Sequence, residues 1–449
     1  MLWRHLCLAR AWSAAGLSTC LIFAGSAFAE PEEPSPAAGT VTETVRVLDA
    51  RQAGDIELEV RGQGQDRVRF AIRNTSAKRL NVVLPPGLVA ASATGQRGGG
   101  GGGFQSMGLG TPTNQPGGFG QFRGAVGSDA GLHSIPVAPT DAQTSTVTVP
   151  AGKTIDLTLP AVCLNFGMPT PTGRDRFELM DVNEYTGDAR VRKALRSLAT
   201  LGTSQGVAQA AMWRVCNDVP FELMRAQASK VINGHEVALA ARFVEAIDAS
   251  GESDVIEPSY LAESRLFIRV QGEGELATEA ARLQEALQGL HLMGLPLCVV
   301  SDNEEPTAAV PALFLNVTLT SSQAGETRGR VLVSRSSQRE GWLPLGKTSF
   351  TEGSTVTVLD GPGLARALDH AMAATFVSVK VARKGANSTT LKVENRLPFT
   401  LANVTIKAGG SSGSPAAPYR ALGIGPARTG QVSIQAASGT IDRIELNGL

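Results

Sequence analysis

The sequence predicts a mixed, β-rich protein of several domains. Gly accounts for 50 of the 449 residues, whereas charged residues make up 18 % and aromatic residues 5 %, a balance typical of strands joined by many turns. At 42 % hydrophobic residues the chain can bury cores, and its length suits about three domains. We therefore expect an N-terminal β-sandwich with a helical subdomain, a small α+β domain and a C-terminal β-sandwich-like module.

The charge balance excludes one class of partner. The chain has 41 Lys and Arg residues against 41 Asp and Glu residues. Binding to nucleic acid or to anionic lipid needs a concentrated basic surface. We expect no nucleic-acid partner.

Residues 1–29 are typical of a cleaved secretory signal peptide. Arg4 and Arg10 precede an apolar stretch at 11–23, and Ala-Phe-Ala at 27–29 fits a small-x-small cleavage site. The apolar stretch is shorter than the ~20 residues that span a bilayer. We expect an exported chain, in the periplasm, at the cell surface or outside the cell, with no transmembrane segment after cleavage.

The N-terminal β-sandwich is expected at 40–172, after a Pro- and Glu-rich linker at 30–39. Val68, Phe70 and Ile72 alternate with other residues, the period-2 pattern of a half-buried strand. Strands are predicted at 42–48, 55–61, 68–73, 80–84, 147–149 and 155–159.

A Gly-rich insert interrupts this module at 95–131. It holds 15 Gly in 37 residues, too little apolar area to offset its chain entropy. The composition predicts a mobile, dispensable loop, although Phe104, Phe119 and Phe122 lie within it.

A helical subdomain is expected at 173–255. Val191, Ala194, Leu195 and Leu198 have the spacing of one apolar helix face. Three further helices are predicted: one from Ser204 to about Cys216, one opening at Pro220, and one whose apolar stripe covers 237–247.

An α+β domain is expected at 260–385, and a C-terminal β module at 386–449. The former resembles the small α/β domains of bacterial envelope lipoproteins, with two helices on one face of a sheet. The run around Asn395 repeats the pattern around Asn74, because each Asn follows an alternating strand. Predicted strands lie at 266–270, 297–300, 312–319, 330–334, 376–381, 390–394, 401–407, 431–435 and 441–446, and predicted helices at 275–287 and 364–374.

Ser204 carries one candidate chemistry. Gly-Thr-Ser-Gln-Gly at 202–206 has the G-x-S-x-G form of a hydrolase nucleophile elbow, which requires a preceding strand. A helix is predicted before it instead. The favoured interpretation is a helix stop followed by a Ser N-cap, and an exported hydrolase that uses Ser204 is an alternative.

We expect no cofactor and no metal site. Gly272-Glu273-Gly274 imitates a dinucleotide-binding loop, but two carboxylates, Glu273 and Glu275, would face the pyrophosphate. The histidines after the signal peptide lack metal-ligand spacing; they are His133, His235, His291 and His370.

Three cysteines remain after the predicted cleavage: Cys163, Cys216 and Cys298. In an oxidising compartment two of them are expected to pair. The favoured pair is a disulfide between Cys163 and Cys216. A thioester, free thiols and pairing with Cys298 are the alternatives.

The thioester alternative comes from a resemblance. Cys163 ends a predicted strand, and the later run Gln209-Ala210-Ala211-Met212-Trp213 resembles the helical motif of the thioester domains of bacterial surface adhesins. The resemblance implies that the Cys163 thiol and the Gln209 amide form a thioester that captures amines. The rest of the chain resembles exported proteins of environmental bacteria that have no established activity.

These patterns favour a non-enzymatic role. We expect an exported envelope or cell-surface binding or scaffold protein whose partner is a protein or an envelope component. A covalent adhesin that uses Cys163 and Gln209 is the first alternative, and the Ser204 hydrolase is the second.

Overall fold

The computed structural model describes residues 42–92, 104–110, 145–201, 203–229, 231–251, 256, 261–307, 310–321, 326–337, 340–352, 359–384, 389–409, 419–421, 424–434 and 440–448. The predicted signal peptide, the predicted linker, His133, Phe119 and Phe122 lie outside these residues. Within them, strands gather in several sheets, which confirms a β-rich chain with a multidomain organisation. No helix in this described part is long and apolar enough to cross a membrane.

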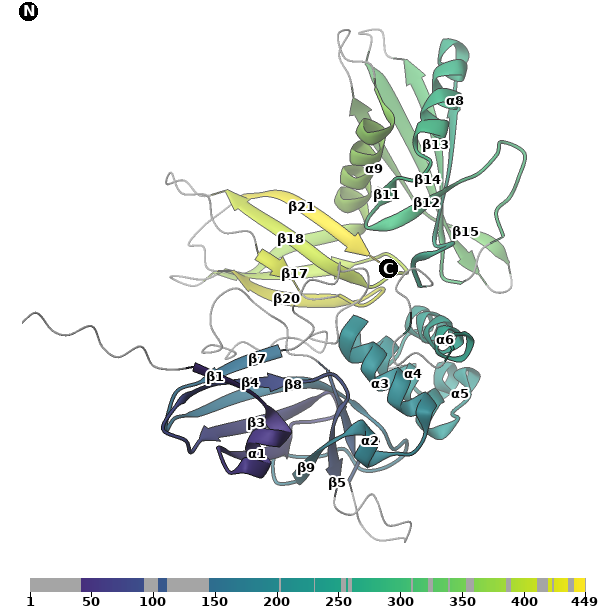
Figure 1. Cartoon of the computed structure of the whole chain (residues 1–449). Helices are drawn as coiled ribbons and strands as arrows, with labels where there is room; N and C mark the ends of the chain where they lie inside the picture. The colour runs from purple at the N-terminus through teal and green to yellow at the C-terminus, as the bar shows by residue number, and fades with distance from the viewer. Residues whose placement is uncertain are drawn as a thin grey trace, which may run out of the picture. The chain divides into compact units, whose positions relative to one another are not determined.

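The N-terminal strands form a closed six-stranded barrel (Figure 1). Closure depends on β9, which pairs with β2 on one side and with β5 on the other, so that both edges of the sheet are joined. Alternate residues such as Phe70 and Ile72 fill the interior. The sequence predicts a β-sandwich here, whereas the structure has a closed barrel. The predicted strands do not include β9, the strand that closes it. The barrel strands, in order, are β2 (Ile56–Gly62), β3 (Arg67–Asn74), β8 (Thr154–Cys163), β6 (Met107–Leu109), β5 (Leu88–Ser92) and β9 (Arg176–Asp181).

The prediction of one continuous loop at 95–131 is wrong for residues 104–110. Strand β6 lies between β8 and β5 in the barrel. Phe104 packs edge-on against Phe177 with ring centroids 5.0 Å apart. A Cβ on Gly108 would lie 2.4 Å from Cδ2 of Leu195, so a larger residue there would require that side chain to shift. The Gly-rich composition conceals a buried strand.

A smaller sheet accompanies the barrel. It has the order β1 (Thr42–Arg46), β4 (Arg79–Leu84) and β7 (Ser145–Val149). The sequence predicts one strand at 42–48, but the chain turns after Arg46 into α1 (Val47–Ala53), which ends at Gly54 with φ +81°. Val47 and Ala50 bury one face of this short helix in the barrel cluster.

The helices follow at α2 (Val182–Tyr185), α3 (Ala189–Leu201), α4 (Gln205–Asn217), α5 (Phe221–Gln227) and α6 (Gly234–Ala249). The predicted stripe of α3 is buried. Asn233 and Glu236 form a complete capping box at the start of α6. The helices begin after β9 rather than at 173, because 176–181 belongs to the barrel.

The next part is a six-stranded sheet with two helices on one face. Leu266, Ile268 and Val270 face the helices, and the intervening residues face the other side. The long edge strand β15 was not among the predicted strands. The sheet order is β11 (His291–Leu292), β12 (Leu295–Val299), β10 (Leu266–Gly272), β13 (Leu313–Ser321), β14 (Thr327–Ser337) and β15 (Gly341–Glu352). The short helix η1 (Gly274–Leu276) and the helices α8 (Ala277–Ala286) and α9 (Gly361–Phe376) complete this part.

The C-terminal strands form two three-stranded sheets. One contains β16 (Val377–Lys384), β17 (Thr389–Asn395) and β20 (Thr429–Ile434). The other contains β19 (Tyr419–Ala421), β18 (Leu401–Gly409) and β21 (Thr440–Gly448). The strand predicted at 376–381 was assigned to the α+β domain, but β16 pairs with β17 and lies in a C-terminal sheet, not in the six-stranded sheet.

Asn74 and Asn395 make the same contacts at their strand ends. Each Oδ1 accepts the backbone N–H two residues later, and each Nδ2 donates to the carbonyl four residues later. Each Nδ2 also binds a distant carbonyl, that of Val149 for Asn74 and that of Ile424 for Asn395. The sequence repeat is therefore a repeated structural device that ties a turn to a remote segment.

Candidate functional site

The structure places Cys163 and Gln209 in direct contact. The backbone N–H of Cys163 donates to Oε1 of Gln209, and Nε2 of Gln209 donates to the Cys163 carbonyl, both at 2.9 Å. The Gln209 amide thus pairs with β8 as a neighbouring strand would. The contact is buried, because Cys163 is 2 % exposed and Gln209 6 %.

A second glutamine extends this contact. Nε2 of Gln205 donates to the carbonyl of Ala161 at 2.7 Å. Two residues along β8 span about 6.6–6.8 Å, and four residues along α4 span about 6 Å, so the two side chains meet alternate carbonyls of the strand. We call Gln205, Gln209, Ala161 and Cys163 the glutamine clasp. Sequence analysis missed Gln205, although its position one turn before Gln209 was the available signal.

The hydrogen bond of the Cys163 thiol goes to Gln65 and not to Gln209. Its Sγ donates to the carbonyl of Gln65 at 3.3 Å, and the residue belongs to the barrel core. Burial, with a smaller contribution from Asp66, raises the pKa of the Cys163 thiol to about 12. The thiol is therefore protonated at neutral pH and is a poor nucleophile.

The favoured disulfide is not formed, since Cys163, Cys216 and Cys298 are all free thiols. Cys216 lies seven residues after Gln209 on α4, which is about 10.5 Å along the helix axis. Because Gln209 holds the backbone of Cys163, Cys216 is carried away from it. Burial raises the pKa of Cys216 to about 12 as well.

Ser204 is the N-cap of α4, as predicted, but its side chain makes no capping hydrogen bond. The residue is 2 % exposed, and its Oγ has no hydrogen-bond partner in the described part of the chain. Helix α3, not a strand, leads to it. A nucleophile elbow needs an exposed Ser after a strand, and this geometry provides neither.

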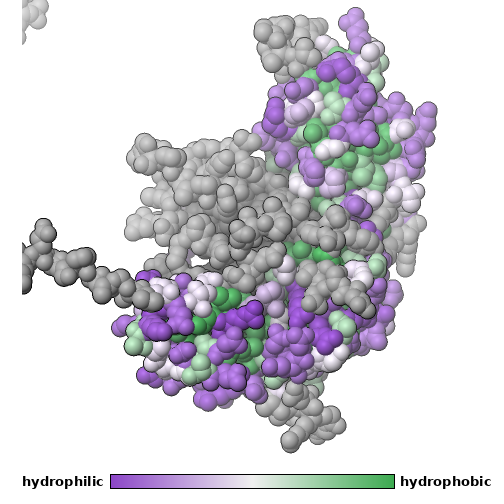
Figure 2. Space-filling model, viewed as in Figure 1, coloured by the Kyte–Doolittle hydropathy of each residue, from purple (hydrophilic) through white to green (hydrophobic). Residues whose placement is uncertain are grey.

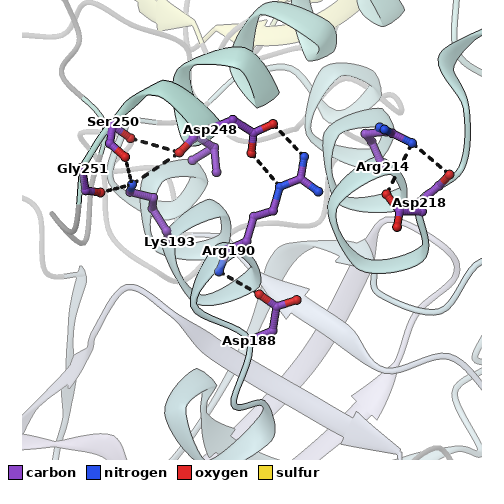
Figure 3. A network of polar contacts seen from close by, with 9 residues as sticks. Asp188, Arg190, Lys193, Arg214, Asp218, Asp248, Ser250 and Gly251 are labelled. Atoms are coloured by element: carbon purple, nitrogen blue, oxygen red, sulfur yellow. Dashed lines mark hydrogen bonds and ion pairs between the residues drawn. The ribbon is translucent and has the colours of Figure 1, made fainter.

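A cleft of about 360 Å³ lies among α3, α4, α5 and α6. Arg190 makes two hydrogen bonds to Asp248, at 2.7 and 2.8 Å, and Arg214 donates to the carbonyl of Asp218 at 3.0 Å (Figure 3). The bonds to Asp248 raise the pKa of Arg190. The cleft lining combines these charges with apolar side chains; it consists of Arg190, Arg214, Pro220, Phe221, Glu222, Ala241, Val244, Glu245 and Asp248.

The candidate metal ligands and the candidate dinucleotide-binding loop form no site in the described residues. No group of three or more His, Cys, Asp or Glu residues that could hold a metal gathers among the residues the structure describes. The Gly272–Gly274 run does connect β10 to a helix, and a Cβ on Gly272 would lie 2.1 Å from the Leu276 carbonyl oxygen. The tight turn alone accounts for this glycine.

No protein-family model matches the chain, and no curated protein matches it in sequence.

Proposed function

We propose that this chain is an exported, non-enzymatic binding or scaffold protein of the cell envelope or cell surface. The observation that carries the proposal is the glutamine clasp. The residues that the sequence offers for covalent chemistry, Cys163 and Gln209, hold α4 against the edge of β8.

Access supports the same conclusion. Cys163, Gln209 and Ser204 are 2 %, 6 % and 2 % exposed. A catalytic or covalent site must admit its substrate to the reacting atom, and these side chains have no such exposure. Their burial is the pattern of packing residues.

The surface offers features that suit recognition instead. The described surface in Figure 2 is mainly hydrophilic, with smaller apolar areas between the charged side chains. The cleft among α3 to α6 joins charged residues to the apolar side chains of Phe221 and Val244, a mixture typical of ligand sites. We also infer that the two C-terminal three-stranded sheets form a β-sandwich-like module.

Export and modification can be tested on one sample. The full chain is expressed in a Gram-negative host, and the intact mass is measured in the exported and cell-associated fractions. We expect an exported species that begins at Glu30 and has the unmodified mass of its sequence. Leu21→Arg, which interrupts the apolar stretch, should abolish the exported species. An uncleaved chain that stays inside the cell would refute the export part of the proposal.

One observation favours a second candidate, the covalent adhesin, because Cys163 and Gln209 do meet. In that case Sγ of Cys163 attacks Cδ of Gln209. The C–S bond forms, the C–N bond breaks, and the amide nitrogen leaves as ammonia with the thiol proton. The bond between Sγ and the Gln65 carbonyl and the pairing of the Gln209 amide with the strand both have to break first.

The same mass measurement separates the two candidates. A thioester gives a chain lighter by one ammonia that gains methylamine, and Gln209→Ala removes both effects. A scaffold gives no ammonia loss and no methylamine addition in either chain. An ammonia deficit in the chain without substitutions would therefore make covalent attachment the function.

A further inference from the structure

The six-stranded sheet has one face without helices. The apolar residues of α8 and α9 pack with Leu315, Val317 and Val331 on the opposite face. On the face without helices, which we call the open face, Leu332 is 38 % exposed. Arg328, Arg330, Lys347 and Ser349 are exposed around it.

Unpaired cations lie at one side of the open face. Arg328, Arg330 and Leu332 alternate along β14, and Leu332 stands opposite Lys347 of β15. In the described part of the chain, the side chains of Arg328, Arg330 and Lys347 have no ion-pair partner. We call these three residues the basic strip.

Unpaired carboxylates lie at the other side of the same face. Asp302, Glu304 and Glu305 are exposed in the segment after β12; we call them the acidic loop. Nε of Arg269 on β10 donates to the Ser301 carbonyl at 3.1 Å and its Nη2 to the Glu304 carbonyl, which ties this loop to the sheet. Among the described residues, none of these three carboxylates has an ion-pair partner.

The two charge groups lie at opposite ends of the same cross-strand rows. One row runs from Arg330 through Thr318 to Gln271, whose Nε2 donates to Asp302 at 3.4 Å. The next row runs from Lys347 through Leu332 and Asn316 to Arg269, which holds the carbonyl of Glu304. Neighbouring strands are about 4.8 Å apart, so each row separates the two signs of charge by several strands.

This arrangement is self-complementary. Two copies can face each other across a two-fold axis that runs parallel to the strands. Each cross-strand row of one copy then lies over a row of the other copy that runs in the opposite direction. The basic strip of one copy then lies over the acidic loop of the other, twice per pair. Asn316, midway along the row from Lys347 to the acidic loop, faces its own counterpart near the axis, and Leu332 lies one strand away over the row of the other copy.

We propose that the open face binds a second copy of this chain, face to face, to form a two-fold symmetric dimer. The charges give the orientation, because a copy placed without row reversal would bring cation onto cation. The exposed Leu332 lies one strand from the axis and is covered by the other copy.

Charge reversal tests this pairing with the full chain. The first variant, Arg330→Glu with Lys347→Glu, makes both ends of the rows acidic. The second, Asp302→Lys with Glu304→Lys, makes both ends basic. Sedimentation velocity measures the mass of each chain alone, of the equimolar mixture and of the chain that carries all four substitutions.

We expect the unaltered chain to dimerise, and its dissociation constant to rise at least tenfold between low and high salt. Each reversed variant alone should be monomeric. The mixture should form a heterodimer, and the fourfold variant should dimerise again. Lys153→Glu, an exposed change on the barrel, is the matched control and should leave the dimer intact.

Two results overturn the proposal. A monomeric unaltered chain at concentrations of about 100 μM and low salt excludes the dimer. A dimer that survives both reversals lies on another surface. Circular dichroism of each variant, compared with the unaltered chain, shows whether a lost dimer reflects lost folding, and rescue in the mixture excludes that explanation directly.

Discussion

At the residue scale, the structure turns a pair of candidate reactive residues into a structural contact. Gln209 fills the hydrogen-bonding positions of Cys163 at a point where β3 no longer pairs with β8. A buried backbone N–H and carbonyl need partners, and a side-chain amide supplies both. The sequence could predict that these residues matter, but not which atoms of Cys163 meet the amide.

Removing the Gln209 amide should destabilise the clasp. Gln209→Ala leaves the N–H and carbonyl of Cys163 buried without partners, which should lower the free energy of unfolding by about 2–4 kcal/mol. Gln205→Ala, which removes one bond, should cost about 1–2 kcal/mol. Urea unfolding in a Trp342→Phe background, with the chain starting at Glu30, follows Trp213 alone. Equal effects of the two substitutions would contradict the two-bond role of Gln209.

The buried thiols predict a stability that falls at high pH. The folded pKa values of Cys163 and Cys216 are raised from 9.0 to about 12, so the folded state favours the protonated thiol. The resulting stability is present below pH 9 and is lost as the pH rises from about 9 toward 12.

Alkylation checks this shift directly. At pH 8 the native thiolate fraction of each should be about 1,000-fold below that of the unfolded chain. Iodoacetamide labelling, located by mass spectrometry with and without urea, measures this difference. Fast native labelling of Cys163 would show that its environment is open.

At the element scale, periodic strands and helices could be predicted, and elements defined by remote partners could not. Strand β3 and helix α3 carry their pattern in their own residues. Strand β5 is buried at every position and shows no alternation, and β6 lies within Gly-rich sequence. Strand β9 is decided by pairing with β2 and β5. Local composition does not indicate which distant strands will pair with such a segment.

The contact between β6 and α3 should show coupled substitutions. Gly108→Ala would place a Cβ 2.4 Å from Leu195, at an expected cost of about 1–3 kcal/mol. Leu195→Ala opens space for this Cβ. The double variant should therefore lose less free energy of unfolding than the two single variants lose together, by at least 0.5 kcal/mol, at about the lower limit for coupled neighbours. Gly187→Ala, with no atom near its Cβ, is the neutral control. Additive losses would indicate that β6 shifts away from α3.

At the scale of the whole molecule, one buried ion pair joins segments 192 residues apart. Arg428 donates to both carboxylate oxygens of Glu236, from Nε at 3.0 Å and from Nη2 at 2.7 Å. The Glu236 side chain is 2 % exposed. Gly206 and Gly425 leave room for it, since a Cβ on either would lie 2.3 or 3.2 Å from the carboxyl group.

Breaking this pair from one side should be costly. Arg428→Ala leaves a buried carboxylate without its cation, and we expect a loss of about 3 kcal/mol in the free energy of unfolding. Arg428→Met with Glu236→Gln removes both charges and should lose less than half as much. Thermal unfolding of both variants, followed by calorimetry, makes the comparison. If the single substitution were the milder one, the pair would not be a stabilising contact.

The glutamine clasp also sets a limit on its own length. A helix advances about 6 Å in four residues and a strand about 6.6–6.8 Å in two, so successive contacts drift apart by roughly 0.6–0.8 Å. Two contacts absorb this drift, whereas a third would be displaced by more than 1 Å. The position for a third is Trp213, which packs edge to face against Phe166 with ring centroids 5.0 Å apart instead of pairing with the strand. The repeat distances of the helix and the strand differ, so only the contacts made by Gln205 and Gln209 fall in register with the strand carbonyls.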